Sequence, residues 1–201
     1  MKINFMSLCS LRPIICFFLL QAMACNSSNT VKPPGYFRIQ LPEKKYQSFN
    51  TATYPYQFEY PVYAAVSKDS TFFGDETENP WWMNINYPQF NASMYISYKE
   101  LSKYDLQKLI NDAYNLTNKH SVKANDIRDS LVKNQHGVYG VFFRVGGDVA
   151  TKYQFFLTDS IKHFVRGALY FDSTPNADSL QPVSDFLAAD MIRLIDSWQW
   201  R

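Results

Sequence analysis

Three histidines carry the side chains best suited to acid–base chemistry or metal binding: His120, His136 and His163. Neutral imidazole is a common metal ligand, and its proton exchanges near neutral pH. No two of these histidines are four residues apart, so no helix could place a pair on one face, as an H-E-x-x-H zinc motif requires. We therefore expect His120 to be a cation at a helix end and His163 to start a strand, half-exposed. The sequence predicts no metal site and no cofactor.

Motifs that activate a serine or hold a nucleotide do not occur. There is no G-x-S-x-G, and there is no G-x-x-x-x-G-K-[ST] loop, so we predict no nucleotide binding. Gly146-Gly147 is expected to form a hairpin turn. Asp75, Glu76 and Glu78 offer oxygen ligands of the kind that Ca²⁺ prefers, but their spacing does not match an EF-hand. A solvated acidic loop is the better interpretation.

The chemistry that the sequence indicates most clearly is acylation of a cysteine. Cys25 follows an apolar run that ends at Leu20, and the small residues Ala22 and Ala24 precede it, as in a bacterial lipobox. The apolar run has the length of a signal peptide and is too short to span a bilayer. We therefore predict that residues 1–24 are removed and that the Cys25 sulfur carries a lipid, with palmitate-type fatty chains.

The remaining cysteines support this interpretation. Cys9 and Cys16 both lie in the removed segment, so Cys25 would remain alone and could form no internal disulfide. A single cysteine in an exported protein calls for an explanation, and acylation supplies one. Two or more acyl chains anchor a protein stably in a membrane. The alternative is an ordinary secretory signal cut after Ala24, with Cys25 playing no part.

The charge of the chain is nearly balanced. Twenty Lys and Arg stand against eighteen Asp and Glu, and removal of Lys2 and Arg12 with the signal leaves equal numbers. A nucleic-acid-binding protein usually carries a basic face, and this balance predicts none. Aromatic residues make up 17% of the chain, which favours strands.

An aromatic segment is the candidate interface. Trp81 and Trp82 are adjacent, and Phe72 and Phe73 precede them, so these rings could bind a partner or stack on a sugar. Adjacent residues of a strand point to opposite faces, so both tryptophans are core only if each face of the sheet is covered.

The elements that would position these residues are short strands and two helices. Apolar alternation or continuous apolar runs predict strands at residues 36–41, 56–60, 62–66, 83–87, 94–98, 127–132, 138–145, 149–158 and 163–171. The last three should form an antiparallel meander, because their connections are short. Residues 25–35 are expected to be a linker to the lipid, and residues 36–201 a single domain.

The two helices are predicted from 3.6-residue apolar stripes. The first follows a capping box at Ser102–Asp105, and the second has Pro182 in its first turn and a stripe from Val183 to Trp198. The predicted fold class is α+β, an antiparallel sheet of short strands covered on one face by both helices. The strand-rich middle and closing helix are similar to Mog1/PsbP-like domains.

Several segments, in the same order along the chain, resemble the GldD family of gliding-motility lipoproteins. Besides the lipobox cysteine, they are residues 32–39 (KPPGYFRI), 41–46 (LPEKKY), 58–61 (FEYP), 82–90, 96–99 (ISYK) and 119–124 (KHSVKA). Pro34 departs from the pattern, where a basic residue is more usual. The resemblance implies a part of the gliding machinery of Bacteroidota-type bacteria, which is coupled to type IX protein secretion. It implies no catalytic residues.

The sequence and the resemblance together predict a non-catalytic, lipid-anchored component that works through contacts with other envelope proteins. The mature start, Cys25–Thr30, lacks the acidic cluster that resembles a surface-export signal, so we expect the domain to face the periplasm. The alternative is a periplasmic lipoprotein that binds peptidoglycan or another glycan through the tryptophan segment. A third hypothesis, an envelope enzyme, would depend on His120 and His163.

Overall fold

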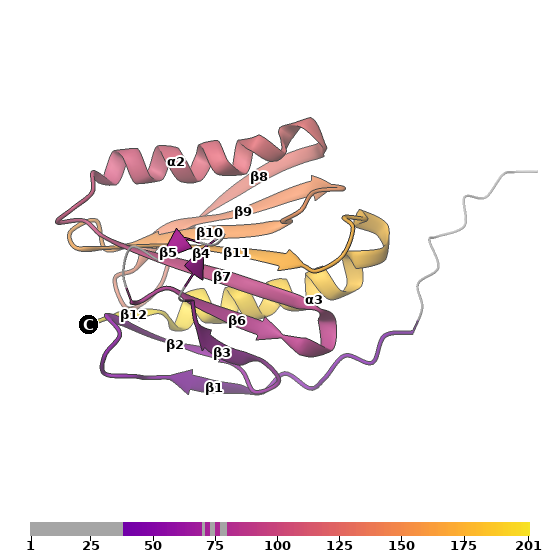
Figure 1. Cartoon of the computed structure of the whole chain (residues 1–201), viewed down its shortest axis with the longest axis horizontal. Helices are drawn as coiled ribbons and strands as arrows, with labels where there is room; N and C mark the ends of the chain where they lie inside the picture. Colours follow the sequence, from indigo (N-terminus) through magenta and orange to yellow (C-terminus); the bar gives the residue numbers. More distant parts are fainter. Residues whose placement is uncertain (1–37, 70, 73–74, 77–79) are drawn as a thin grey trace, which may run out of the picture. The chain divides into compact units, whose positions relative to one another are not determined.

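The computed structural model describes residues 38–69, 71–72, 75–76 and 80–201 (Figure 1). Its elements are β1 (Tyr46–Phe49), β2 (Tyr56–Pro61), β3 (Ala65–Lys68), β4 (Thr71–Phe72), β5 (Asp75–Glu76), β6 (Met83–Tyr87), η2 (Pro88–Phe90), β7 (Ala92–Glu100), α2 (Leu106–Asn118), η3 (Lys119–Val122), β8 (Ala124–Lys133), β9 (Tyr139–Gly147), β10 (Tyr153–Thr158), β11 (His163–Phe171), α3 (Ala177–Ser197) and β12 (Gln199–Trp200). The α+β fold class is confirmed. Within the described residues, no helix has the length and apolar character needed to cross a membrane.

The main sheet is antiparallel and has the strand order β3-β6-β7-β11-β10-β9-β8. The predicted meander is confirmed, because β9, β10 and β11 are neighbours in chain order. β7 and β11 lie far apart in the sequence and pair over nine positions, from Ala92 opposite Phe171 to Glu100 opposite His163. A smaller sheet, β1-β2-β12, joins the two ends of the described chain.

The glycine pair lies in a strand and not in the expected turn. Gly146 and Gly147 end β9, and Gly147 pairs with Ala124 of β8. Gly147 has a φ of 94°, which residues with a Cβ rarely adopt. A Cβ there would also lie 2.6 Å from the Lys123 carbonyl oxygen. The backbone thus needs glycine at this point, where β8 begins beside the end of β9.

The two helices cover opposite faces of the sheet, which corrects the expectation that both lie on one face. Leu109 and Ala113 of α2 pack with Phe143 of β9 and Phe156 of β10. α3 packs on the other face, where its residues share the larger core with Phe155 of β10. The sequences of β9, β10 and β11 are nearly continuous apolar runs, because successive side chains point to opposite faces of the sheet and both faces are buried there.

The first helix begins later than the capping box predicts. Asp105 is the N-cap of α2, and its carboxylate accepts a hydrogen bond of 2.8 Å from the Lys108 backbone N–H. An N-cap carboxylate also interacts favourably with the positive end of the helix dipole. The helical stripe itself is confirmed, with Leu109 and Ala113 buried and Tyr114 packed edge-on against Phe143 at 5.0 Å.

The closing helix starts a turn earlier than predicted. Asn176 caps α3 by accepting a hydrogen bond from the Ser179 backbone N–H at 2.9 Å, so Pro182 lies beyond the first turn. The apolar stripe is confirmed, and Leu187, Met191 and Trp198 are fully buried. After Trp198 the chain forms β12, which pairs with β2.

The predicted strand at residues 36–41 is wrong over its described part. Residues 38–41 are not a strand, and Ile39 and Leu41 are 38% and 43% exposed. Apolar alternation alone does not form a strand, because a strand needs a neighbour to pair with its backbone. The first strand is β1, after Pro42, which pairs with β2.

A buried carboxylate links this first segment to the closing helix. The Asp190 side chain in α3 is fully buried and accepts hydrogen bonds from Lys44 Nζ at 2.6 Å, from Tyr46 Oη at 2.9 Å and from Tyr63 Oη. Lys44 Nζ also donates to the Phe186 carbonyl oxygen at 2.7 Å. We call these four side chains, Lys44, Tyr46, Tyr63 and Asp190, the Asp190 cluster. It ties the segment around Lys44 and Tyr46 to α3.

Candidate functional site

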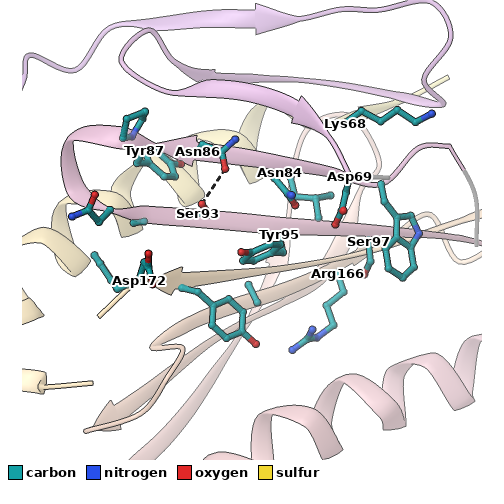
Figure 2. A pocket seen from close by; sticks show the side chains of 18 residues that line it. Lys68, Asp69, Asn84, Asn86, Tyr87, Ser93, Tyr95, Ser97, Arg166 and Asp172 are labelled. Carbon is teal, nitrogen blue, oxygen red and sulfur yellow. Dashed lines mark hydrogen bonds between the residues drawn. The ribbon is translucent and has the colours of Figure 1, made fainter. Parts of the chain in front are cut away.

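The main sheet carries an open cavity of about 980 Å³ on the face that bears α2. We call it the sheet-face pocket; its polar lining includes Asn84, Asn86, Ser93, Ser97, Tyr95, Tyr170 and Arg166. Figure 2 labels all of these except Tyr170 and shows the labelled side chains on neighbouring strands, with Arg166 near Ser97. α2 packs on β9, β10 and the start of β11 on this face, and the pocket lies over β6, β7 and β11 beside it.

The cavity forms because small and large side chains alternate across the strands. In one cross-strand row Tyr95 stands opposite Ala168, and in the next Ser93 stands opposite Tyr170. In a third row Ser97 stands opposite Arg166. Directly opposite side chains on one face are neighbours, so each small residue leaves space beside a large one. The rings of Tyr95 and Tyr170 meet edge to face at 5.6 Å.

Four charged residues line the pocket: Lys68, Asp69, Arg166 and Asp172. The Arg166 guanidinium is partly buried and donates to the Gln154 side-chain oxygen. Burial lowers the pKa of Arg166, and the neighbouring Tyr170 opposes that shift. Among the ion pairs within the described residues, none involves Arg166. A partly buried guanidinium without a carboxylate is a strong anchor for an anion, because it can form two parallel hydrogen bonds.

Asn84, in the pocket lining, and Gln154, which accepts from Arg166, each have a polar atom with unused hydrogen-bonding capacity. Within the described residues, Asn84 Oδ1 and Gln154 Nε2 are buried atoms without a hydrogen-bond partner. A buried polar atom without a partner costs about 1–3 kcal/mol, so such atoms call for an explanation. Asn86 and Ser93, in contrast, are joined by a 3.0 Å hydrogen bond, drawn in Figure 2. Asn84 Oδ1 can therefore accept from a donor on a ligand, and the Arg166 guanidinium can donate to an acceptor.

A second feature is the open edge of the main sheet at β8. Among the described strands, β8 pairs only with β9, so one side of its ten-residue backbone faces outward. Leu131 on this strand is 88% exposed, and Val122 in the preceding η3 is 91% exposed. An outer strand of this kind can pair with an extended segment of another protein.

The histidines are not gathered into one site. His163 is buried, 3% exposed, and not half-exposed as expected, because β12 places Trp200 over its ring, stacked at 5.0 Å. Its Nδ1 lies 2.6 Å from Tyr98 Oη, and burial lowers its pKa. His120 follows α2, where burial and the charge of Arg166 lower its pKa. Within the described residues, no three His, Cys, Asp or Glu side chains are grouped to hold a metal.

The two tryptophans have different surroundings. Trp82 is 7% exposed, and its indole N–H donates to the Tyr98 carbonyl oxygen at 2.8 Å. Trp81 is partly exposed and donates to the Thr53 carbonyl oxygen at 2.9 Å. Trp82 also lines the sheet-face pocket. The interface role of this aromatic segment stays a prediction.

The other predicted site residues lie outside what the structure describes. These are Cys25, Phe73, Glu78 and the side chains of Phe72, Asp75 and Glu76. The backbones of β4 and β5 pair as a two-stranded ladder where a loop was expected.

The pocket residues were not singled out from the sequence, although a signal for them exists. Asn84 and Asn86 alternate with buried apolar residues of β6, and Ser93 and Ser97 do so along β7. This alternation predicts a polar face on two consecutive strands. It cannot show that β7 is the neighbour of β11, which contributes Arg166 from 69 positions beyond Ser97.

Comparison with known proteins places the chain in a family. No curated protein matches it. It is similar to the solution structure of cyanobacterial PsbP (CyanoP) from Synechocystis sp., with 15% sequence identity and a TM-score of 0.44, over 85% of this chain and 99% of that one. At that TM-score the likeness supports no further argument. The model of the gliding motility lipoprotein GldD family matches residues 26–200, nearly the whole length beyond Cys25. This chain therefore belongs to the gliding motility lipoprotein GldD family.

Proposed function

We propose that this lipoprotein is a non-catalytic component of the gliding machinery and of the coupled type IX secretion system, and that it works by contacts with other envelope proteins. Residues 1–24 are the signal peptide, Cys25 is acylated, residues 25–35 are the linker, and residues 36–201 are the domain, which faces the periplasm. Membership of a gliding motility lipoprotein family supports the setting. The β8 edge supports the mode of action, because its outward backbone groups can pair with a partner's extended segment.

Site-specific crosslinking in intact cells tests this proposal. A photoreactive residue replaces Leu131 on the β8 edge, and the matched control replaces Ile161, which is 84% exposed in the turn between β10 and β11. We expect discrete adducts with envelope proteins from position 131 and few from position 161. Equal labelling from both positions, in cells that still spread, would show that the β8 edge is not the contact.

The anchor is tested separately. Cys25→Ser removes the sulfur that would carry the lipid, so we expect the variant to leave the membrane fraction and to fail to support spreading. Membrane partitioning and spreading that persist in the variant would refute acylation at Cys25 as the basis of the function.

Glycan binding is the second candidate function, and one observation favours it. The sheet-face pocket combines exposed aromatic rings with amide and hydroxyl side chains on one rigid surface. Small-ligand sites are concave and place a few convergent polar groups to fix the ligand's orientation. Purified sacculi should retain the wild-type protein and release the Arg166→Gln variant. Equal retention of the two proteins would show that this pocket is not the glycan-binding site.

A further inference from the structure

We infer that the sheet-face pocket binds an acidic saccharide, whose carboxylate is held by Arg166 and whose hydroxyl groups are held by the polar side chains of β6 and β7. The inference deepens the second candidate function and does not depend on the protein contacts of the β8 edge. It assigns both a chemical class of ligand and a residue that selects its charge.

The charge of the ligand follows from the surroundings of Arg166. Its described partner is the neutral Gln154 side chain, and no described ion pair includes it. The guanidinium lines the cavity and is partly buried, so its charge is poorly solvated. A ligand carboxylate would replace the lost solvation with two charge-assisted hydrogen bonds. The lining also includes Lys68, Asp69 and Asp172, so the selection of an anion depends on the Arg166 guanidinium and not on the net charge of the cavity.

The hydroxyl-rich character of the ligand follows from the neutral part of the lining. Amide and hydroxyl side chains both donate and accept, and a saccharide presents such groups along its whole length. The buried Asn84 Oδ1, which has no partner among the described residues, can accept from a ligand hydroxyl. The pocket floor between Tyr95 and Arg166 is formed by the small residues Ser97 and Ala168.

The aromatic rings and the volume fit the same class of ligand. Tyr95 is 40% exposed and its ring is held by Tyr170, so a fixed ring stands over the cavity. Sugar rings pack their C–H faces on such rings. A cavity of about 980 Å³ lies at the upper end of the range of small-ligand sites, which leaves room for more than one sugar unit.

Calorimetric titration of the full-length protein in detergent micelles tests the inference with two matched probes. The acidic probe is a hyaluronan tetrasaccharide, which alternates N-acetylglucosamine with glucuronate. The neutral probe is tetra-N-acetylchitotetraose, which has the same length and neither carboxylates nor free amines. We expect binding of the acidic probe and about tenfold or more weaker binding of the neutral one, because the loss of a hydrogen-bonded charge costs about 1.5–3 kcal/mol.

Four variants locate the binding. Arg166→Gln should weaken the acidic probe about tenfold or more, and Arg166→Lys should restore only part of the loss, because lysine lacks the planar fork. Ser97→Tyr should block the pocket without a change of charge. This variant tests the pocket if the Arg166 variants do not fold. Arg128→Gln is the control, because the Arg128 side chain is 70% exposed on β8 and pairs with Asp126.

Three results would overturn the inference. They are equal affinity for the two probes, wild-type affinity of the folded Arg166→Gln protein, and binding of a glutamate pentapeptide in place of the tetrasaccharide. The last result would make the pocket a peptide site. None of them bears on the crosslinks from position 131, so failure of this inference and failure of the proposed protein contacts remain distinguishable.

Discussion

Removal of the Asp190 carboxylate should be the most damaging single change to the stability of the domain. The side chain is fully buried and accepts from Lys44, Tyr46 and Tyr63, so Asp190→Ala leaves a partly buried ammonium and two hydroxyl groups without their acceptor. Breaking a buried ion pair from one side costs about 3–5 kcal/mol. For a domain of this size, that corresponds to a fall in Tm of roughly 10 °C.

Partial and compensated variants sharpen this prediction. Asp190→Asn keeps an acceptor oxygen but loses the charge, so we expect a smaller cost of about 2 kcal/mol. The double variant Asp190→Leu with Lys44→Met removes both charges and should cost less than Asp190→Ala alone, because no uncompensated charge remains. Asp196→Ala is the control, since Asp196 lies exposed on the same helix.

Urea denaturation followed by tryptophan fluorescence measures these differences, because Trp198 is fully buried in the core. The free energies of unfolding of the wild-type protein, of Asp190→Leu and Lys44→Met alone and of the double variant complete a double-mutant cycle for the pair. A cost below about 1 kcal/mol for Asp190→Ala would refute the reasoning, because it would place the cluster in contact with solvent.

Three further predictions concern Tyr46, His163 and Gly147. Burial and the Asp190 carboxylate raise the pKa of Tyr46 to about 12, so the folded state holds the phenol proton more tightly than the unfolded chain. The free energy of unfolding should therefore fall as the pH rises from 10 to 12. In urea titrations, Tyr46→Phe should reduce that fall. Burial lowers the pKa of His163, so the folded state binds the imidazole proton less well than the unfolded chain does. Stability should therefore decrease as the pH falls below 6.5. A pH profile of Tm that His163→Gln leaves unchanged would contradict this. Gly147→Ala should destabilise more than Gly137→Ala in thermal melts, because both glycines have positive φ but only Gly147 has backbone where the Cβ would lie; equal shifts in Tm would contradict this.

The fold class could be predicted from the sequence alone, because it depends on local patterns of apolar residues. The apolar stripes of α2 and α3 and the alternation in β6 and β7 depend on neighbouring residues only, and the structure confirms them. The lipobox pattern at Cys25 is equally local, and the predicted acylation follows from a contiguous stretch of residues. Local pattern did mislead at residues 38–41, where alternation occurs without a partner strand.

Only the tertiary structure decided which faces the helices cover and where a ligand could bind. The apolar runs of β9, β10 and β11 do not show which helix covers which face of the sheet. In the structure, α3 covers one face and α2 covers part of the other. The pocket joins Asn84 and Ser97 to Arg166, and the Asp190 cluster joins Lys44 to α3. Such contacts depend on strand order and register, which are set by the packing of segments far apart in the chain and not by any one segment's own pattern.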